Sequence, residues 1–466
     1  MLQRPEQMDF EKTVKMGYGA SHTYFLHQVL DNPTAFNFYV RIKFDRQGEF
    51  SRIEEAIKAV GQRHESLRTA YFANPERLNE PTMGVLKDSQ IKVQHIPIST
   101  EEEKEKISEK LRNKEFDIEH GEVARAAYLP LGKSHSYLVL CFHHIATDGF
   151  SLNLFLKDFS AFFYGQELPP IERQFSDFGV LQRLDAEKGS YKKELAFWRS
   201  QFKTLPEPMP ILPMSKVTSR RPLTRYEYTI GEEITLDKKT TQLIKDLVRR
   251  NKSTKYHFFM TVLKIFLSHF VDGDDVCIGL ADANRNDPKT VYTIGNIMNM
   301  LPLRLPIDHK QTFSDALKDA RDRSYQAMAN QRVPFYLLAE DLKVPRSTSH
   351  TPLFQVLMDY RLMSARIPGL DANTDGEILY GQTAYDLTVD ITEHDQTEFR
   401  INILAQKSLY DKEATNMILH SYVQLIKTFA VASDTQLNKI KPYKASLYSK
   451  DEVEASKKLG RGMSFF

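Results

Sequence analysis

The residues best suited to chemistry lie in one short segment, 143–149 (HHIATDG), which follows the apolar run 137–142. The run is typical of a buried strand, and an apolar helix pattern begins soon after the segment. A histidine in a loop between a strand and a helix can present its ring to a cleft. The dipole at the start of the helix disfavours the imidazolium form. The pattern therefore predicts that His144 is a neutral proton acceptor at pH 7.

Two residues of the same segment have supporting roles. Asp148 lies close enough to the strand end to fix the loop through a buried ion pair. Gly149 removes a side chain where a substrate would pass. We expect the following helix to span 152–164, with Ser151 as its N-cap.

Strand and helix patterns alternate along the rest of the chain, which predicts an α/β fold. With 466 residues the chain is too long for one ordinary core, so two lobes are expected. A proline-rich connector at 203–221 follows the first set of elements. We predict a first lobe at 1–185, which carries the histidine segment, a second lobe at 186–450 and a C-terminal tail at 451–466.

Composition excludes several classes of protein. The formal net charge of +2 gives no basic excess for nucleic-acid binding. Cys141 and Cys277, the two cysteines, lie in apolar runs and indicate buried thiols in a reducing compartment. The chain starts without an apolar signal core and has no run of about 18 apolar residues, so we expect a cytoplasmic location and no membrane contact.

The motif HHxxxDG and six further segments in the same order resemble the condensation domains of nonribosomal peptide synthetases. These domains share a superfamily with chloramphenicol acetyltransferase, and the likeness is greatest to those of fungal polyketide–peptide hybrid synthetases. The chain departs from the family pattern at Ala20 and His22, where Gln and Arg are usual, and at Met298 and Met300. The matching segments are 16–26, 63–72, 175–182, 294–304, 330–335 and 346–354.

The resemblance implies two chloramphenicol acetyltransferase-like lobes with mixed sheets, arranged in a V around a central tunnel. It implies that strand 385–391 crosses to the other lobe and roofs this tunnel. In the motif, the catalytic residues would be His144, His143 and Gly149. His144 would be the base or positioning residue, and His143 would support it with its ring turned into the lobe. The main-chain N–H of Gly149 would face the thioester oxygen. Arg285 would be the ion-pair partner of Asp148.

The implied reaction joins a carrier-bound polyketide acyl thioester to a carrier-bound aminoacyl group through an amide bond. Asn299, Met298 and Met300 would line the substrate path. We expect no metal and no cofactor bound by this chain, because both substrates would arrive on the 4′-phosphopantetheine of carriers. The expected partners are an upstream acyl carrier protein, a downstream peptidyl carrier protein and neighbouring synthase domains, with the isolated chain a monomer.

Two alternatives stay open at this stage. One is an acyltransferase of the same superfamily that uses acyl-coenzyme A and a free alcohol or amine. Plant-type members carry DFGWG towards the C-terminus, whereas here 177–179 (DFG) lies mid-chain and is followed by Val180. The other is a non-catalytic module for carrier docking or product release. The intact motif argues against it. The acyl chain and the amino acid are not specified by the sequence.

Overall fold

The computed structural model folds into two compact units, each made of segments that are separated along the chain. Unit 1 comprises Met1–Lys192, Asp282–Asn299 and Ser364–Gln382, and unit 2 comprises Lys193–Ala281, Met300–Met363 and Thr383–Phe466. The structure describes residues 5–45, 47–133, 135–223, 225, 227–363, 372–374, 384–394 and 398–439. The predicted boundaries at 185 and 450 stay a prediction.

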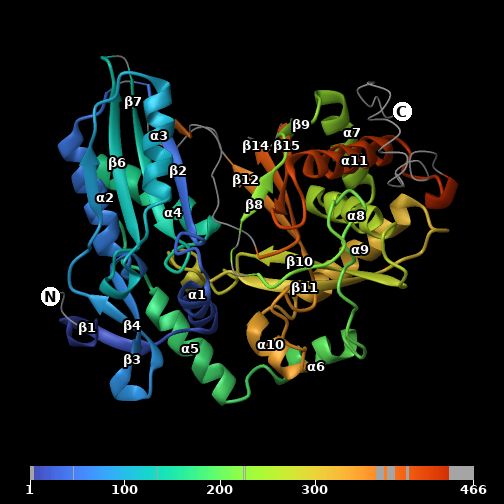
Figure 1. Ribbon diagram of the computed structural model, residues 1–466, viewed down its shortest axis with the longest axis horizontal. Helices are drawn as coiled ribbons and strands as arrows, with labels where there is room; N and C mark the ends of the chain where they lie inside the picture. Colours follow the sequence, from blue (N-terminus) through green and yellow to red (C-terminus); the bar gives the residue numbers. More distant parts are fainter. Residues whose placement is uncertain are drawn as a thin grey trace. The chain divides into compact units, whose positions relative to one another are not determined.

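Unit 1 is built on a five-stranded mixed sheet (Figure 1). The two central strands are antiparallel over their full length, from the pair Asn37–His143 to the pair Phe44–Ser136. In sheet order the strands are β13 (Ala372–Thr374), β2 (Asn37–Phe44), β7 (His135–His143), β6 (Ala124–Leu131) and β5 (Lys92–His95). Only β5 pairs parallel to its neighbour among these described strands.

Both faces of strand β7 are buried, and its side chains alternate between two sets of neighbours. Phe142 contacts Phe155 of helix α4 (Gly149–Phe163), with ring centroids 5.2 Å apart. Tyr137 and Cys141 belong to the core cluster that includes Leu111 of helix α3 (Glu101–Arg112). The alternation therefore directs His143, the last residue of the strand, to the same side as Tyr137 and Cys141.

A smaller antiparallel sheet completes unit 1 with strands β1 (Phe10–Lys15), β4 (Glu80–Leu86) and β3 (Thr69–Asn74). Helix α1 (Tyr18–Val29) is held by helix α5 (Phe175–Glu187). There the Arg183 guanidinium donates to the Ser21 hydroxyl at 2.9 Å and to the Met16 carbonyl at 2.9 Å. Helix α2 (Phe50–Arg63) packs beside α4.

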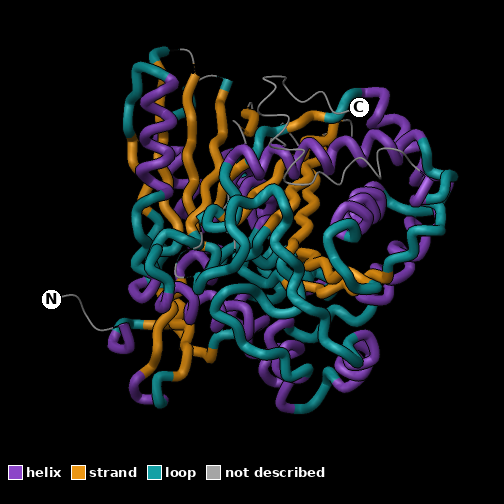
Figure 2. Tube along the Cα trace, turned by 45° about the vertical axis from the view of Figure 1, so that its right-hand side comes forward, coloured by secondary structure: helices purple, strands orange, loops and turns teal. Residues whose placement is uncertain are grey.

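Unit 2 contains a seven-stranded mixed sheet. Figure 2 colours the strands of the molecule orange and its helices purple. Every residue of helix α8 from His257 to Leu267 is buried, and Tyr422 of α11 donates to the Phe259 carbonyl at 2.9 Å. The strands are β11 (Asn299–Pro306), β10 (Asp275–Asp282), β12 (Val356–Met363), β14 (Leu387–His394), β15 (Glu398–Gln406), β8 (Tyr228–Ile230) and β9 (Ile234–Thr235). The helices are α6 (Lys192–Gln201), α7 (Lys238–Arg250), α8 (Lys255–Leu267), α9 (Phe313–Met328), α10 (Phe335–Asp341) and α11 (Lys412–Val431).

The mixed α/β class is confirmed, but the crossing strand was assigned to the wrong segment. Strand β14 pairs with β12 and β15 inside unit 2 and does not leave its own sheet. The strand that joins the sheet of unit 1 is β13, which pairs with β2 from Ala372–Phe44 to Thr374–Ile42. Period-two alternation identifies a strand but carries no information about which sheet it joins. The V-shape and the tunnel stay predictions, and the tunnel loses the support of segment 385–391.

None of the helices in the described part of the chain is long and apolar enough to cross a membrane.

Candidate active site

His144 occupies the first position of the loop between β7 and α4, and the residue as a whole is partly exposed. Its main-chain N–H donates to the Phe36 carbonyl at 2.8 Å. Its ring lies beside Phe38, with the two centroids 5.5 Å apart. The backbone of His144 is therefore fixed by a hydrogen bond, and its ring packs against Phe38.

The pKa of His144 is lowered from its ordinary value, first by desolvation of the ring. Backbone hydrogen bonds at His144 and Thr147 and the charge of Asp148 act in the opposite direction. A histidine with a lowered pKa is neutral at pH 7. The sequence predicts the same neutral form, and the largest cause of the lowered pKa in the structure is burial.

His143 is fully buried, and its ring points into unit 1. Its Nδ1 accepts the main-chain N–H of Ile145 at 3.1 Å, and its Nε2 lies 3.3 Å from Nδ1 of His27. Burial holds the pKa of His143 well below its ordinary value. The ring is buried within unit 1 and hydrogen-bonded on both of its nitrogens.

Asp148, rather than Ser151, is the N-cap of helix α4. Its carboxylate accepts the main-chain N–H of Ser151 at 2.9 Å and the Ser151 hydroxyl at 2.7 Å. The predicted cap was therefore wrong by three residues. The helix begins at Gly149, because an aspartate at this position satisfies an otherwise unpaired N–H group of the first turn.

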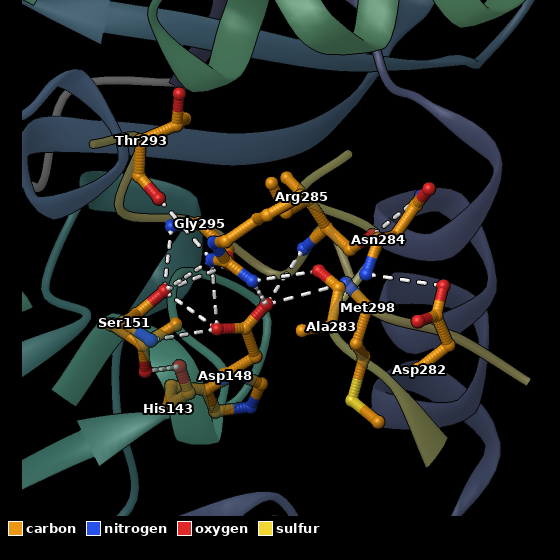
Figure 3. Close-up of polar contacts among 12 residues, drawn as sticks. His143, Asp148, Ser151, Asp282, Ala283, Asn284, Arg285, Thr293, Gly295 and Met298 are labelled. Carbon is orange, nitrogen blue, oxygen red and sulfur yellow. Dashed lines mark hydrogen bonds and ion pairs between the residues drawn. The ribbon is translucent and has the colours of Figure 1, made fainter. Parts of the chain in front are cut away.

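The same carboxylate forms the buried ion pair with Arg285 that the resemblance implies (Figure 3). Arg285 Nη2 lies 2.9 Å from Oδ1 and Nη1 lies 3.0 Å from Oδ2, which is a bidentate geometry. The exposed fraction of the residue is 2% for Asp148 and 9% for Arg285. The main-chain N–H groups of Ile297 and Met298 also donate to Oδ2, each at 3.2 Å. One carboxylate thus connects the loop, the helix and segment 282–299.

Ser151 is a structural residue of the site that the sequence did not identify. Its hydroxyl contacts Asp148, accepts from Arg285 Nη2 at 3.0 Å, and accepts the main-chain N–H of Gly295 at 3.0 Å. The position of a serine in the first turn of a helix does not distinguish such a residue from an ordinary N-cap. Only the fold brings Gly295 beside it, 144 residues further along the chain.

The segment that supplies Arg285, residues 283–285 (ANR), is fixed by its neighbours. Asn284 has a left-handed backbone (φ 54°), which Asn tolerates better than most residues. Its side chain donates to the Ile297 carbonyl at 2.9 Å, and its main-chain N–H donates to Asp282 at 3.2 Å. Desolvation raises the pKa of Asp282 to about 6.

The other predicted residues lie at the ends of the same segments. Gly149 is the first residue of α4 and is partly exposed. Met298 contacts Asp148 through its main chain, and Asn299, the first residue of β11, is buried. Met300 belongs to unit 2. The catalytic role of Gly149 and the substrate contacts of Asn299, Met298 and Met300 stay predictions.

The described residues hold no candidate metal cluster, and the cysteine nearest to the motif is a buried thiol. Within 5–45, 47–133, 135–223, 225, 227–363, 372–374, 384–394 and 398–439, no group of three or more His, Cys, Asp or Glu side chains could hold a metal ion. Burial raises the pKa of the Cys141 thiol to about 12, so a thiolate is not available there at neutral pH.

Comparisons with known proteins show the family of this chain. The family model described as "Condensation domain" matches residues 21–446. The chain is 38% identical over 456 residues to the hybrid PKS-NRPS synthetase buaA of Petromyces alliaceus, which covers 97% of this chain and 11% of that protein. The chain therefore spans about a tenth of the length of this relative.

Two solved structures share the fold. The condensation domain from monacolin K polyketide synthase MokA superposes with a TM-score of 0.86 at 23% identity, covering 92% of this chain and 100% of that chain. A complex of the X-domain and OxyB from teicoplanin biosynthesis gives a TM-score of 0.80 at 18% identity, covering 95% of this chain and 98% of that chain. With its matched motif and fold, the chain belongs to the condensation-domain family.

Proposed function

We propose that this chain is the condensation domain of a fungal polyketide–peptide hybrid synthetase and forms an amide bond between two carrier-bound substrates. The donor is a polyketide acyl thioester on an acyl carrier protein, and the acceptor is an aminoacyl thioester on a peptidyl carrier protein. Both substrates are held on 4′-phosphopantetheine arms. The likeness to buaA over 97% of this chain supports the reaction class and the type of partner.

The observation that carries the proposal is the contrast between the two histidines of the motif. His143 is fully buried and hydrogen-bonded, whereas His144 is partly exposed, neutral and anchored through its backbone. Only His144 can therefore meet a reacting group. A neutral imidazole can accept a proton from the attacking amine or orient that amine by accepting its N–H.

The reaction proceeds by direct acyl transfer. The acceptor amine attacks the thioester carbon, the C–N bond forms, and the tetrahedral intermediate loses its pantetheine thiolate as the C–S bond breaks. The proton lost by the amine goes to His144 and then to the thiolate, which leaves as a thiol. Ser151 and Cys141 are buried, which supports transfer without a covalent enzyme intermediate.

Asp148 and Arg285 hold the loop in place. Their ion pair lies at the start of α4 and does not contact the reacting atoms. Gly149 is the first residue of α4, and in this proposal its main-chain N–H stabilises the thioester oxygen. Asn299, Met298 and Met300 line the substrate path in this proposal.

The test uses the purified domain, a donor carrier loaded with a polyketide-type acyl chain and an acceptor carrier loaded with an amino acid. Intact-mass spectrometry of both carriers follows the transfer. We expect the acyl group to move to the acceptor carrier with the wild-type domain and product formation to fall by at least ~10²-fold with His144→Ala. The melting temperature should be nearly unchanged.

His95→Ala is the matched control, because His95 is exposed on strand β5, at the far edge of the same sheet. Near-wild-type turnover by His144→Ala at saturating carriers would refute its assignment. Transfer from acyl-coenzyme A to a free amine at the same rate would favour the acyltransferase alternative. Binding of both carriers without product would favour the docking module. The fold of this chain also occurs in an X-domain that forms a complex with OxyB.

A further inference from the structure

A third histidine, His27 on helix α1, contacts the HHxxxDG loop from outside the motif. Nδ1 of His27 lies 3.3 Å from Nε2 of His143. The two rings meet edge to face, with centroids 5.0 Å apart and planes at 80°. His27 follows directly after the opening segment 16–26.

The hydrogen bonds determine the protonation of both rings. Nδ1 of His143 accepts the N–H of Ile145 and therefore carries no proton, so in the neutral ring the proton is on Nε2. That Nε2–H points to Nδ1 of His27, which must then be unprotonated and act as the acceptor. Burial lowers the pKa of His27, while Glu115 and Glu119 act in the opposite direction.

This pair of rings fixes the peptide on both sides of His144. The His143 ring holds the N–H of Ile145, and the N–H of His144 itself donates to the Phe36 carbonyl. The main-chain N–H of Ala146 also returns to the His143 carbonyl at 3.1 Å. A shift of the His143 ring would therefore move the backbone that carries His144.

Helix α1 is a firm support for this contact. Tyr24, one turn before His27, donates its hydroxyl to Glu119 at 3.1 Å and accepts the main-chain N–H of Ala73 at 3.0 Å. The helix is thus tied to strand β3 and to the segment that carries Glu119. His27 connects this fixed helix to the catalytic loop.

We infer that His27 is a positioning residue for the condensation reaction. It accepts the Nε2–H of His143 and so sets the position of His144. The inference rests on the proposed role of His144 as the group that meets the amine. His27 itself touches no reacting atom. What the position requires is a hydrogen-bond acceptor at Nδ1 rather than a ring that fills space.

Two substitutions separate these requirements. His27→Asn keeps an acceptor oxygen close to the place of Nδ1, whereas His27→Leu keeps bulk and removes the acceptor. We expect His27→Leu to lower kcat about tenfold with little change in KM for either carrier, because a misplaced catalytic group costs transition-state stabilisation. His27→Asn should recover most of that loss.

Hydrogen exchange gives a second readout, independent of activity. The amide of Ile145 should exchange faster in His27→Leu than in the wild type and regain protection in His27→Asn. His95→Leu is the matched control and should alter neither kcat nor this amide.

The outcomes distinguish this inference from the proposed function. If His144→Ala is inactive while folded His27→Leu has wild-type kcat, the positioning role is refuted and the proposed function stands. If His27→Asn is as impaired as His27→Leu, the acceptor is not what matters and the inference also fails. If His144→Ala is fully active, the proposed function fails first, and the positioning role fails with it.

Discussion

Removing one partner of the Asp148–Arg285 pair should destabilise unit 1 strongly. Both side chains are almost completely buried, at 2% and 4% exposure, so neither charge can be solvated when its partner is lost. Arg285 also lies over the Phe150 ring, with 4.6 Å from the guanidinium carbon to the centroid. This ring offers only weak compensation for a lost carboxylate.

The expected magnitudes follow from these contacts. Breaking a buried pair costs about 3–5 kcal/mol and loss of an N-cap about 1 kcal/mol, so Asp148→Ala should cost about 4–6 kcal/mol. Arg285→Ala should cost about 3 kcal/mol, the lower end of that range, because Ser151, Ile297 and Met298 still donate to the carboxylate. The double variant leaves no buried unpaired charge. It should be more stable than the sum predicts by about 2–3 kcal/mol.

The assay is a double-mutant cycle by urea unfolding, with hydrogen exchange of the α4 amides as a readout confined to unit 1. If Asp148→Ala does not fold, the cycle can be built from Asp148→Asn and Arg285→Gln. The control is the exposed pair Asp9 and Lys87, with 2.6 Å between Oδ2 and Nζ, where no measurable coupling is expected. Additive effects of Asp148→Ala and Arg285→Ala would show that the ion pair is not the source of the stability.

Two further predictions concern stability. Ser151→Ala should lower the free energy of unfolding by about 1–3 kcal/mol, because the buried N–H of Gly295 loses its acceptor. The control Ser51→Ala, at an exposed position, should have little effect. Equal melting temperatures of the two variants would contradict this prediction. The pKa values of His22 and His257 are lowered by burial from 6.5 to about 4. Between these two pKa values the unfolded chain binds more protons than the folded chain, so the stability that the two histidines contribute should decline as the pH falls from about 6.5 to about 4. Asp282 acts in the opposite direction, because its pKa is raised to about 6 in the folded protein. Urea unfolding at several pH values should show a weaker dependence in His257→Gln, and an unchanged dependence would refute the assignment.

The local chemistry of the site could be predicted because it lies in consecutive residues. The spacing of HHxxxDG predicted a strand, a loop and a helix, and the structure has β7 and α4 on either side of His144. The Asp148–Arg285 contact came from the resemblance, since nothing in the spacing connects residues 137 positions apart. The N-cap was misassigned because Asp148 and Ser151 are both good capping residues and only the backbone geometry decides between them.

Features that depend on long-range pairing could not be predicted. Segment 385–391 and strand β13 lie close together in the chain, but one joins the sheet of unit 2 and the other that of unit 1. The importance of His27 and Ser151 has the same origin. Their partners, His143 and Gly295, lie 116 and 144 residues away, and no local pattern marks a side chain that holds another side chain.

The way the site is assembled also bears on what counts as a lobe. The HHxxxDG loop lies before residue 150, but the guanidinium and two of the backbone N–H groups that hold Asp148 come from segment 282–299. A lobe that ended at residue 185 would leave the Asp148 carboxylate with only Ser151 as a donor among the partners described above. The chain must therefore complete the first elements of unit 2 and return before His144 has its final support. The position of His144 is thus a property of the fold of unit 1 as a whole, and the HHxxxDG sequence alone does not provide it.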